Sequence, residues 1–233
     1  PVMGTGFTLD TPLRVARYGI SSVVSLVDDV IIEQARKFHC QKNGEPYEAI
    51  PAGQPDARAR RITAYLNLVD RLVQEQLRHL KAAPFEPGSE ISRYFELLPP
   101  SPLKEDYQRM LTATDPLAKK RLQEELRGRV TAGSIDVNIM TKLDAEHSNN
   151  GSKLPAEFSD GMAALRGFAL STLHSAMVFS AGINQRLYTY AAQFDDFFPD
   201  AHGASPKKII LKVSDYRSAL IQGKFLAKRG LWV

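Results

Sequence analysis

The sequence has little of what several protein classes require. It contains 233 residues and a single cysteine, Cys40, so an internal disulfide is excluded and a disulfide-stapled secreted scaffold is not expected. No apolar run approaches the roughly 18 residues that a membrane-spanning helix needs, and we expect no membrane partner. These absences favour a soluble protein of a reducing compartment, and we expect a cytoplasmic location.

Several catalytic and binding motifs are also missing. The five histidines form neither an HExxH motif nor a paired Cys/His spacing for zinc, although Asp144 and His147 could share a metal or lie in a solvated loop. Neither a P-loop nor a GxSxG elbow occurs. The net charge is only +4, and the basic clusters at 58–61 and 119–121 lack interleaved aromatic residues. Solvated helix faces explain them better than a nucleic-acid surface, so we expect no nucleic-acid partner.

An alternation of strand-like and helix-like segments is present instead. Apolar, β-branched runs are each followed by a segment with helical spacing or a helix cap. Such alternation implies parallel strands joined by right-handed helical crossovers. The expected strands cover residues 2–7, 20–27, 134–144, 175–181 and 208–213.

A long helical region interrupts this alternation. Residues 57–81 carry the strongest amphipathic pattern in the chain, and proline-separated shorter helices follow at 91–98, 103–111 and from 116. We interpret residues 45–133 as an all-helical insertion. It separates two strand-helix units in residues 1–44 from three further units in residues 134–233.

Two α/β folds fit five such units, namely an open doubly wound sheet and a (β/α)₈ barrel. A TIM barrel typically needs eight units and about 250 residues. The chain begins with Pro1 rather than Met, and its last four residues, GLWV, resemble the opening of another strand. We therefore predict an incomplete TIM-barrel-like fold with about five βα units, present as a fragment of a longer protein.

The segment 134–144, SIDVNIMTKLD, carries the strongest functional signal. Ile135, Val137 and Ile139 alternate with polar residues that include Asp136 and Asn138. A polar row is unusual on a strand buried on both faces, but it fits a barrel strand whose inner side faces a ligand. Ligands of both candidate folds bind at the carboxyl ends of the strands.

Five candidate ligand-binding residues follow from the strand ends: Gly4, Thr5, Gly6, Asn138 and Lys212. Glycines permit close backbone approach to a flat ligand, asparagine both donates and accepts hydrogen bonds, and lysine supplies a cation. The set suits a polar heteroaromatic ring or an anionic cofactor. Structural alternatives stay open, because the glycines could form an ordinary turn and Lys212 could be an edge-strand charge.

The segments PVMGTGF, TPLRVARYG, VNIMTKLD, SAMVFSAG and KIILKVSDYRSALIQGKFLAKRGL resemble the N-terminal half of FMN-dependent barrels of the nitronate monooxygenase (2-nitropropane dioxygenase-like) group. The resemblance implies a flavin-dependent oxidoreductase with FMN as cofactor and a small-molecule substrate. It places Gly4, Thr5 and Gly6 against the flavin ring and gives Asn138 and Lys212 contacts near it.

The sequence also departs from that family. The helical insertion is not typical of it, and Gly6-Phe7 replaces the usual proline-methionine pair. The family's phosphate loops and Gly-Gly-His segment come after the point where this sequence stops, so the catalytic residues stay unknown.

Two other functions remain open. One is another phosphate-ligand barrel enzyme, an aldolase or isomerase, with Lys212 or Lys142 as a Schiff-base lysine. The other is a non-catalytic binding or assembly protein that uses the helical insertion. The sequence also leaves open whether the protein forms a homo-oligomer.

Overall fold

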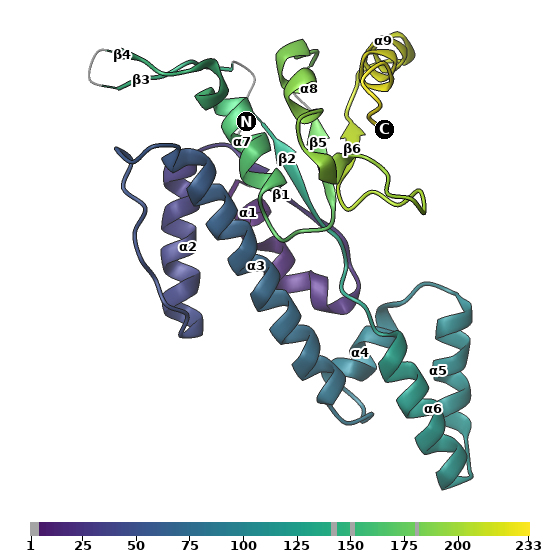
Figure 1. Cartoon of the computed structure of the whole chain (residues 1–233). Coiled ribbons are helices and arrows are strands. Elements are labelled where there is room, and N and C mark those ends of the chain that lie inside the picture. The colour runs from purple at the N-terminus through teal and green to yellow at the C-terminus, as the bar shows by residue number, and fades with distance from the viewer. Residues whose placement is uncertain (1–4, 141–143, 150–151, 180–181) are drawn as a thin grey trace.

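The computed structural model describes residues 5–140, 144–149, 152–179 and 182–233. It is an α/β structure built on a parallel sheet of four described strands (Figure 1). These strands are β1 (Ser22–Leu26), β2 (Ile135–Ile139), β5 (Ala176–Phe179) and β6 (Lys208–Leu211). A short antiparallel ribbon, β3 (Ser148–Asn149) and β4 (Ser152–Lys153), projects from the same end of the molecule as the carboxyl ends of the strands.

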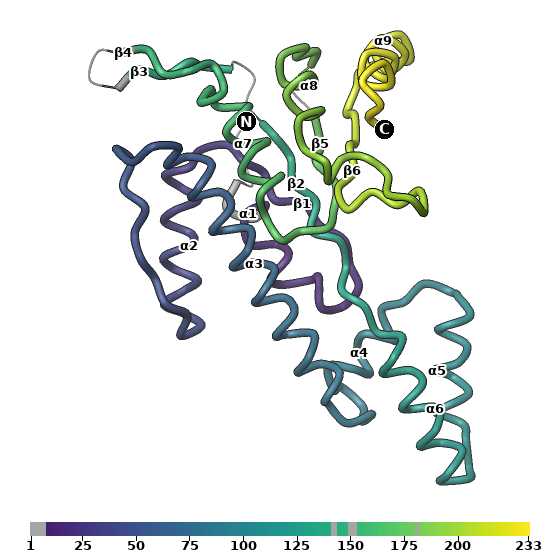
Figure 2. Tube along the Cα trace, in the orientation of Figure 1, coloured from purple at the N-terminus to yellow at the C-terminus, as the bar shows by residue number. Residues whose placement is uncertain are grey.

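The helices occupy most of the remaining chain, and the tube in Figure 2 follows their order. Several begin at an aspartate or serine whose side chain accepts backbone N–H groups, as Asp28 does for Val30 at 2.6 Å. The α-helices are α1 (Thr5–Val15), α2 (Asp29–Asn43), α3 (Ala57–Ala82), α4 (Glu90–Leu97), α5 (Pro102–Thr112), α6 (Pro116–Arg129), α7 (Asp160–Ala169), α8 (Gln185–Ala191) and α9 (Tyr216–Ala227).

The four strands lie side by side in chain order, β1-β2-β5-β6, and every neighbouring pair is parallel. The register aligns Val24 with Val137, Val137 with Met177, and Met177 with Ile209. These four side chains point to one face and are at most 3% exposed. They pack in one core with residues of α3, α7 and α8, so the helical crossovers cover this face.

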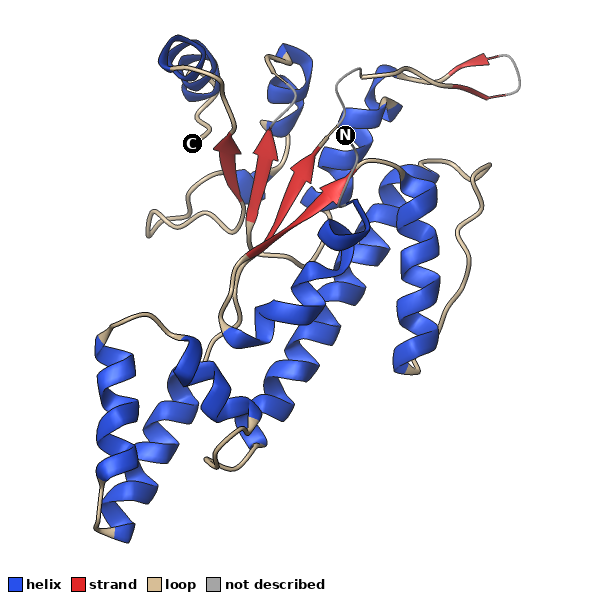
Figure 3. Ribbon diagram, turned by 180° about the vertical axis from the view of Figure 1, so that it is seen from behind, coloured by secondary structure: helices blue, strands red, loops and turns tan. Residues whose placement is uncertain are grey.

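The opposite face of the sheet is here called the open face, and it carries Val23, Asp136, Asn138, Val178 and Ile210. Val23 is 37% and Ile210 44% exposed, and Asp136, Asn138 and Val178 are half-buried. Ser25 and Ala176, which lie on the same face, are only 5% and 6% exposed. Figure 3 shows the sheet from this side, with α3 and α7 behind it. Alternation along each strand therefore separates a helix-covered apolar face from a more accessible, partly polar one.

A second apolar core lies at the far end of α3, where α4, α5 and α6 form a helical lobe (Figure 1). Leu77 and Leu80 of α3 join it, whereas Ile62 and Tyr65 belong to the sheet core. The chain returns from the lobe to β2 through Gly133. Its N–H donates to the Ala16 carbonyl at 2.8 Å, and an added Cβ would lie 2.2 Å from backbone atoms of Ile20, so only glycine fits there.

Four of the five expected strands are confirmed over shorter ranges, the one expected at 134–144 only as Ile135–Ile139, and so is the helix expected at 57–81. Residues 141–143, 180 and 181 of the expected strands lie outside the described part. The strand predicted at 2–7 is wrong at residues 5–7, because these residues form the start of helix α1. Residues 1–4 lie outside the described part. Leu9, Leu13 and Ala16 recur at helical spacing and face the sheet core. The described sheet accordingly contains four strand-helix units and not five, and the sequence boundaries at residues 44 and 133 stay predictions.

Candidate functional site

Asn138 and Lys212 lie on the same face of the sheet. Asn138 is half-buried on β2, between Ser25 of β1 and Val178 of β5. The N–H of Lys212 donates to the Phe179 carbonyl at 3.0 Å and extends the ladder beyond β6. Since Ile210 pairs with Val178, Lys212 also points to the open face. It lies two strands from Asn138, about 10 Å across the sheet.

The other predicted ligand residues are placed differently. Gly4 lies outside the described residues, as does Lys142. Thr5 and Gly6 form the first turn of α1 and do not end a strand. Lys212 is exposed, which is not the desolvated setting that activates a Schiff-base lysine, so the aldolase alternative gains no support from it.

Asp144 and His147, which could share a metal or lie in a solvated loop, contact different partners. Asp144 accepts the Gly161 N–H at 2.8 Å and approaches the Asn184 amide at 3.4 Å. His147 contacts Asp160 and lies 3.0 Å from Arg58. In the described part of the chain no group of three His, Cys, Asp or Glu side chains could hold a metal ion.

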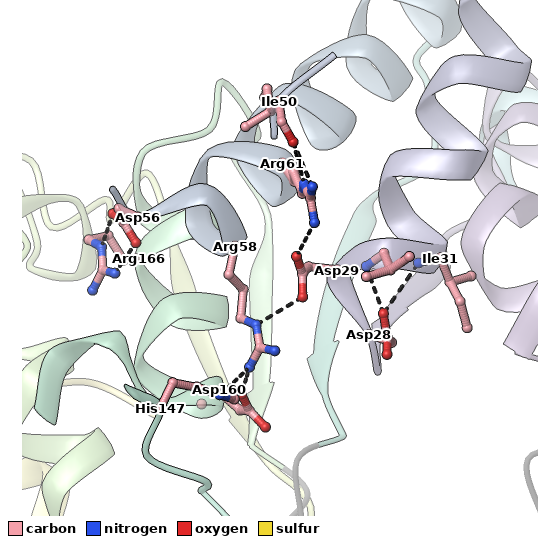
Figure 4. Close-up of polar contacts among 12 residues, drawn as sticks. Asp28, Asp29, Ile31, Ile50, Asp56, Arg58, Arg61, His147, Asp160 and Arg166 are labelled. Atoms are coloured by element: carbon pink, nitrogen blue, oxygen red, sulfur yellow. Dashed lines mark hydrogen bonds and ion pairs between the residues drawn. The ribbon is translucent and has the colours of Figure 1, made fainter. Parts of the chain in front are cut away.

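The structure reveals a charged cluster at the carboxyl edge beside β1 (Figure 4). Three helices begin there, and each contributes a side chain from its first two residues: Asp29 of α2, Arg58 of α3 and Asp160 of α7. Arg58 donates from Nε to Asp29 at 3.0 Å and from Nη1 to Asp160. The guanidinium of Arg58 thus joins the starts of all three helices.

Arg61 and Arg166 extend this cluster on either side. Arg61 donates to Asp29 at 2.8 Å and to the Ile50 carbonyl at 2.6 Å, and the side chains of the ion pair are only 9% and 10% exposed. Arg166 forms an ion pair with Asp56. Burial alone would lower the pKa of Arg166, but its hydrogen bonds to Asp56 and Tyr190 outweigh burial and raise that pKa, so the guanidinium stays charged.

A cavity of about 560 Å³ opens next to this cluster, within the range typical of small-molecule sites. We call it the edge cavity. Both charged or polar residues and apolar residues line it. Its lining comprises Asp29, Val30, residues 52–58, Arg61, His147, Ser148, Leu154, Pro155 and Phe158.

Sequence reasoning missed this cluster for a clear reason. In the sequence alone, Arg58 belongs to a basic cluster typical of a solvated helix face, His147 to a polar loop, and Asp29 to an acidic pair after a strand. Arg58 and His147 are 89 residues apart in the chain, so no local spacing links them. The available signal was the acidic pair Asp28-Asp29 that follows the strand at 20–27, because the carboxyl end of a strand lies at the edge where ligands bind.

No helix in the described residues is long and apolar enough to cross a bilayer. Comparison with protein-family models, with curated proteins and with solved structures finds no match. What this site does must therefore be argued from its own geometry.

Proposed function

We propose that this protein is an FMN-dependent oxidoreductase with a TIM-barrel-like fold, similar to the nitronate monooxygenase group. The flavin ring would lie on the open face near the carboxyl ends of the strands. The observation that carries the proposal is the common orientation of Asn138 and Lys212, one half-buried amide and one cation on the same face.

The strand order supports a barrel over an open doubly wound sheet. A doubly wound sheet reverses its order at a switch point and carries helices on both faces. Here the order β1-β2-β5-β6 does not reverse, and the described crossovers pack on one face. In a barrel the open face would be the inner wall, which accounts for its polar residues Asp136 and Asn138.

The residues of the open face fit a flavin ring. Asn138 would donate to and accept from the polar edge of the ring. Lys212 would stabilise negative charge that develops on it. When bound, FMN would supply the chemistry by taking up an electron pair from the substrate, and the protein would orient the ring and tune it electrostatically.

The role of Thr5 and Gly6 changes in this proposal. Because they open α1, their N–H groups are among those that a helix leaves without an internal acceptor. Such N–H groups suit an anionic group of a ligand better than the flat face of a ring.

The test is the binding of FMN to the full-length protein that contains this sequence, measured by the visible absorbance and fluorescence of the flavin. We expect Lys212→Ala and Asn138→Asp each to weaken binding about tenfold, the scale of one charge-assisted hydrogen bond. Lys208→Ala is the matched control, because Lys208 is an exposed lysine of the same strand and face at its amino end.

Two outcomes would refute the proposal. One is that the protein takes up no FMN when the cofactor is supplied. The other is that Lys208→Ala weakens binding as much as Lys212→Ala, because the loss would then reflect the overall charge of the sheet face and not a contact at its carboxyl edge.

A further inference from the structure

We propose that the edge cavity is a binding site for a small organic anion, a ligand with one anionic head and an apolar body. It is distinct from the proposed flavin site, because it lies among α2, α3 and residues 147–148 and 154–158, and its lining contains no residue of the open face.

The apolar residues of the lining indicate the chemistry of the ligand's body. Val30 projects from the first turn of α2 and is 51% exposed. Leu154, Pro155 and Phe158 face the cavity from the other side, and Pro55 lines it from the start of α3. Apolar side chains that line an accessible cavity of this size favour a ligand whose hydrocarbon part leaves water on binding.

The charged and polar residues of the lining indicate the chemistry of the ligand's head. The two acidic residues of the lining are already paired, since Asp29 accepts from Arg58 and Arg61 and Asp56 from Arg166. Nη2 of Arg58 has no hydrogen-bond partner among the described residues. The Arg58 side chain is 29% exposed, so this group is accessible to a ligand. The Arg58 guanidinium is itself paired with Asp29 and Asp160, so the preference for an anionic acceptor rests on this available N–H group and not on a net positive charge.

Two further donors stand near Arg58. His147 lines the same cavity, and its Nδ1 has no hydrogen-bond partner among the described residues, whereas its Nε2 contacts Arg58 and Asp160. Gln54 accepts from Arg60 through Oε1 at 2.6 Å, and its amide nitrogen has no partner in the described part of the chain. A carboxylate and a phosphate monoester share the chemistry that these donors recognise.

The experiment titrates the full-length protein with octanoate, octyl phosphate and 1-octanol by isothermal titration calorimetry. We expect one site that binds at least one of the two anions about tenfold more tightly than the alcohol, since the three probes share a hydrocarbon chain and differ in the head. The stronger of the two anions then identifies the head. Equal affinity for 1-octanol, or binding of neither anion, overturns the proposal.

A pair of neighbouring variants locates the site. Val30→Glu places a carboxylate at the mouth of the cavity and should weaken binding of the anion about tenfold. Ile31→Glu is the matched control, because Ile31 is the next residue of α2, is 43% exposed and does not line the cavity. Both positions are exposed, so neither variant disturbs a core. Equal loss in the two variants overturns the assignment to this cavity.

Two more variants test the head and the independence of the site. Arg58→Gln should weaken binding of the anion while leaving the weak affinity for 1-octanol unchanged. Lys212→Ala should leave octanoate and octyl phosphate binding unchanged even if it abolishes FMN binding. If Lys212→Ala lost the binding of octanoate and octyl phosphate, these anions would bind at the proposed flavin site and not in the edge cavity. That outcome would refute this inference and leave the proposed function standing.

Discussion

His39 is a buried histidine whose protonation state is coupled to the free energy of unfolding. It lies on α2 at 7% exposure, 5.1 Å from the ring of Phe38 and 6.5 Å from that of Tyr65. Burial lowers its pKa from the usual 6.5, and the nearby carboxylate of Asp10 offsets part of that effect. The folded protein therefore holds this imidazole neutral.

The pH dependence follows from that direction. Below pH 6.5 the unfolded chain binds a proton at His39 that the folded protein resists, so the free energy of unfolding falls as the pH falls from 6.5 towards the lowered pKa. Urea unfolding at pH 7.5 and 5.5 should show a smaller loss of stability in His39→Gln than in the wild type. His202→Gln, at an exposed histidine, is the control. An unchanged loss in His39→Gln would contradict this prediction.

Helix α3 and helix α7 approach closely enough to require a glycine. A Cβ at Gly167 would lie 2.6 Å from Cγ2 of Ile62 and 3.0 Å from the Ala59 carbonyl oxygen. The Gly167 carbonyl also accepts from the Thr63 hydroxyl at 2.9 Å. This contact holds α7 against the long helix that links both cores.

Gly167→Ala should therefore destabilise the protein by about 1–3 kcal/mol, the usual cost of overpacking. Gly223→Ala in α9 is the matched comparison, because an added Cβ there meets nothing within 4 Å. It should stabilise the protein by about 0.5–1 kcal/mol through its effect on helix propensity. Urea denaturation measures both, and a change of the same sign in the two variants would contradict the role given to the α3–α7 contact.

At the level of elements, the sequence predicts the helices and strands in which apolar residues recur at a regular spacing. Helix α3 has 26 residues, long enough for its apolar spacing to stand out, and the alternation of β2 correctly placed Asn138 on the face opposite Val137. The strand expected at 2–7 is wrong at residues 5–7 because α1 begins there, and Pro12, a residue that typically opens a helix, lies inside it. Pairings such as Arg58 with Asp160 could not be predicted, since they depend on three helices meeting at one edge.

Helix α3 contributes to the two larger apolar cores of the described residues and also to a small third cluster of Cys40, Leu68 and Leu72. In the helical lobe, Phe95 is fully buried and stacks on Tyr107 with ring centroids 5.0 Å apart. Phe85 and Tyr94 complete this aromatic group. Such a compact satellite core can open locally without the sheet.

Phe95→Ala should remove about 3–5 kcal/mol of stability from the helical lobe by leaving a cavity. Hydrogen exchange followed by mass spectrometry should then accelerate in α4, α5 and α6 and remain slow in β2 and β5. Phe38→Ala, at a residue 58% exposed, should leave both regions unchanged. If Phe95→Ala accelerated the sheet as strongly as the lobe, the two cores would form one cooperative unit and the prediction would be wrong.

The position of the helical lobe between β1 and β2 also has a kinetic consequence. These strands are neighbours in the sheet, yet helices α2 to α6 lie between them in the chain, whereas single helical crossovers join β2 to β5 and β5 to β6. Closing the longer segment costs more chain entropy unless that segment is already folded. The backbone hydrogen bonds of Gly133 to Ala16 and of Ser22 to Ser134 hold the last residues of this segment beside the residues that lead into β1. We therefore expect the pairing of β1 with β2 to be the slow step of sheet assembly, with its rate set by how early the lobe folds.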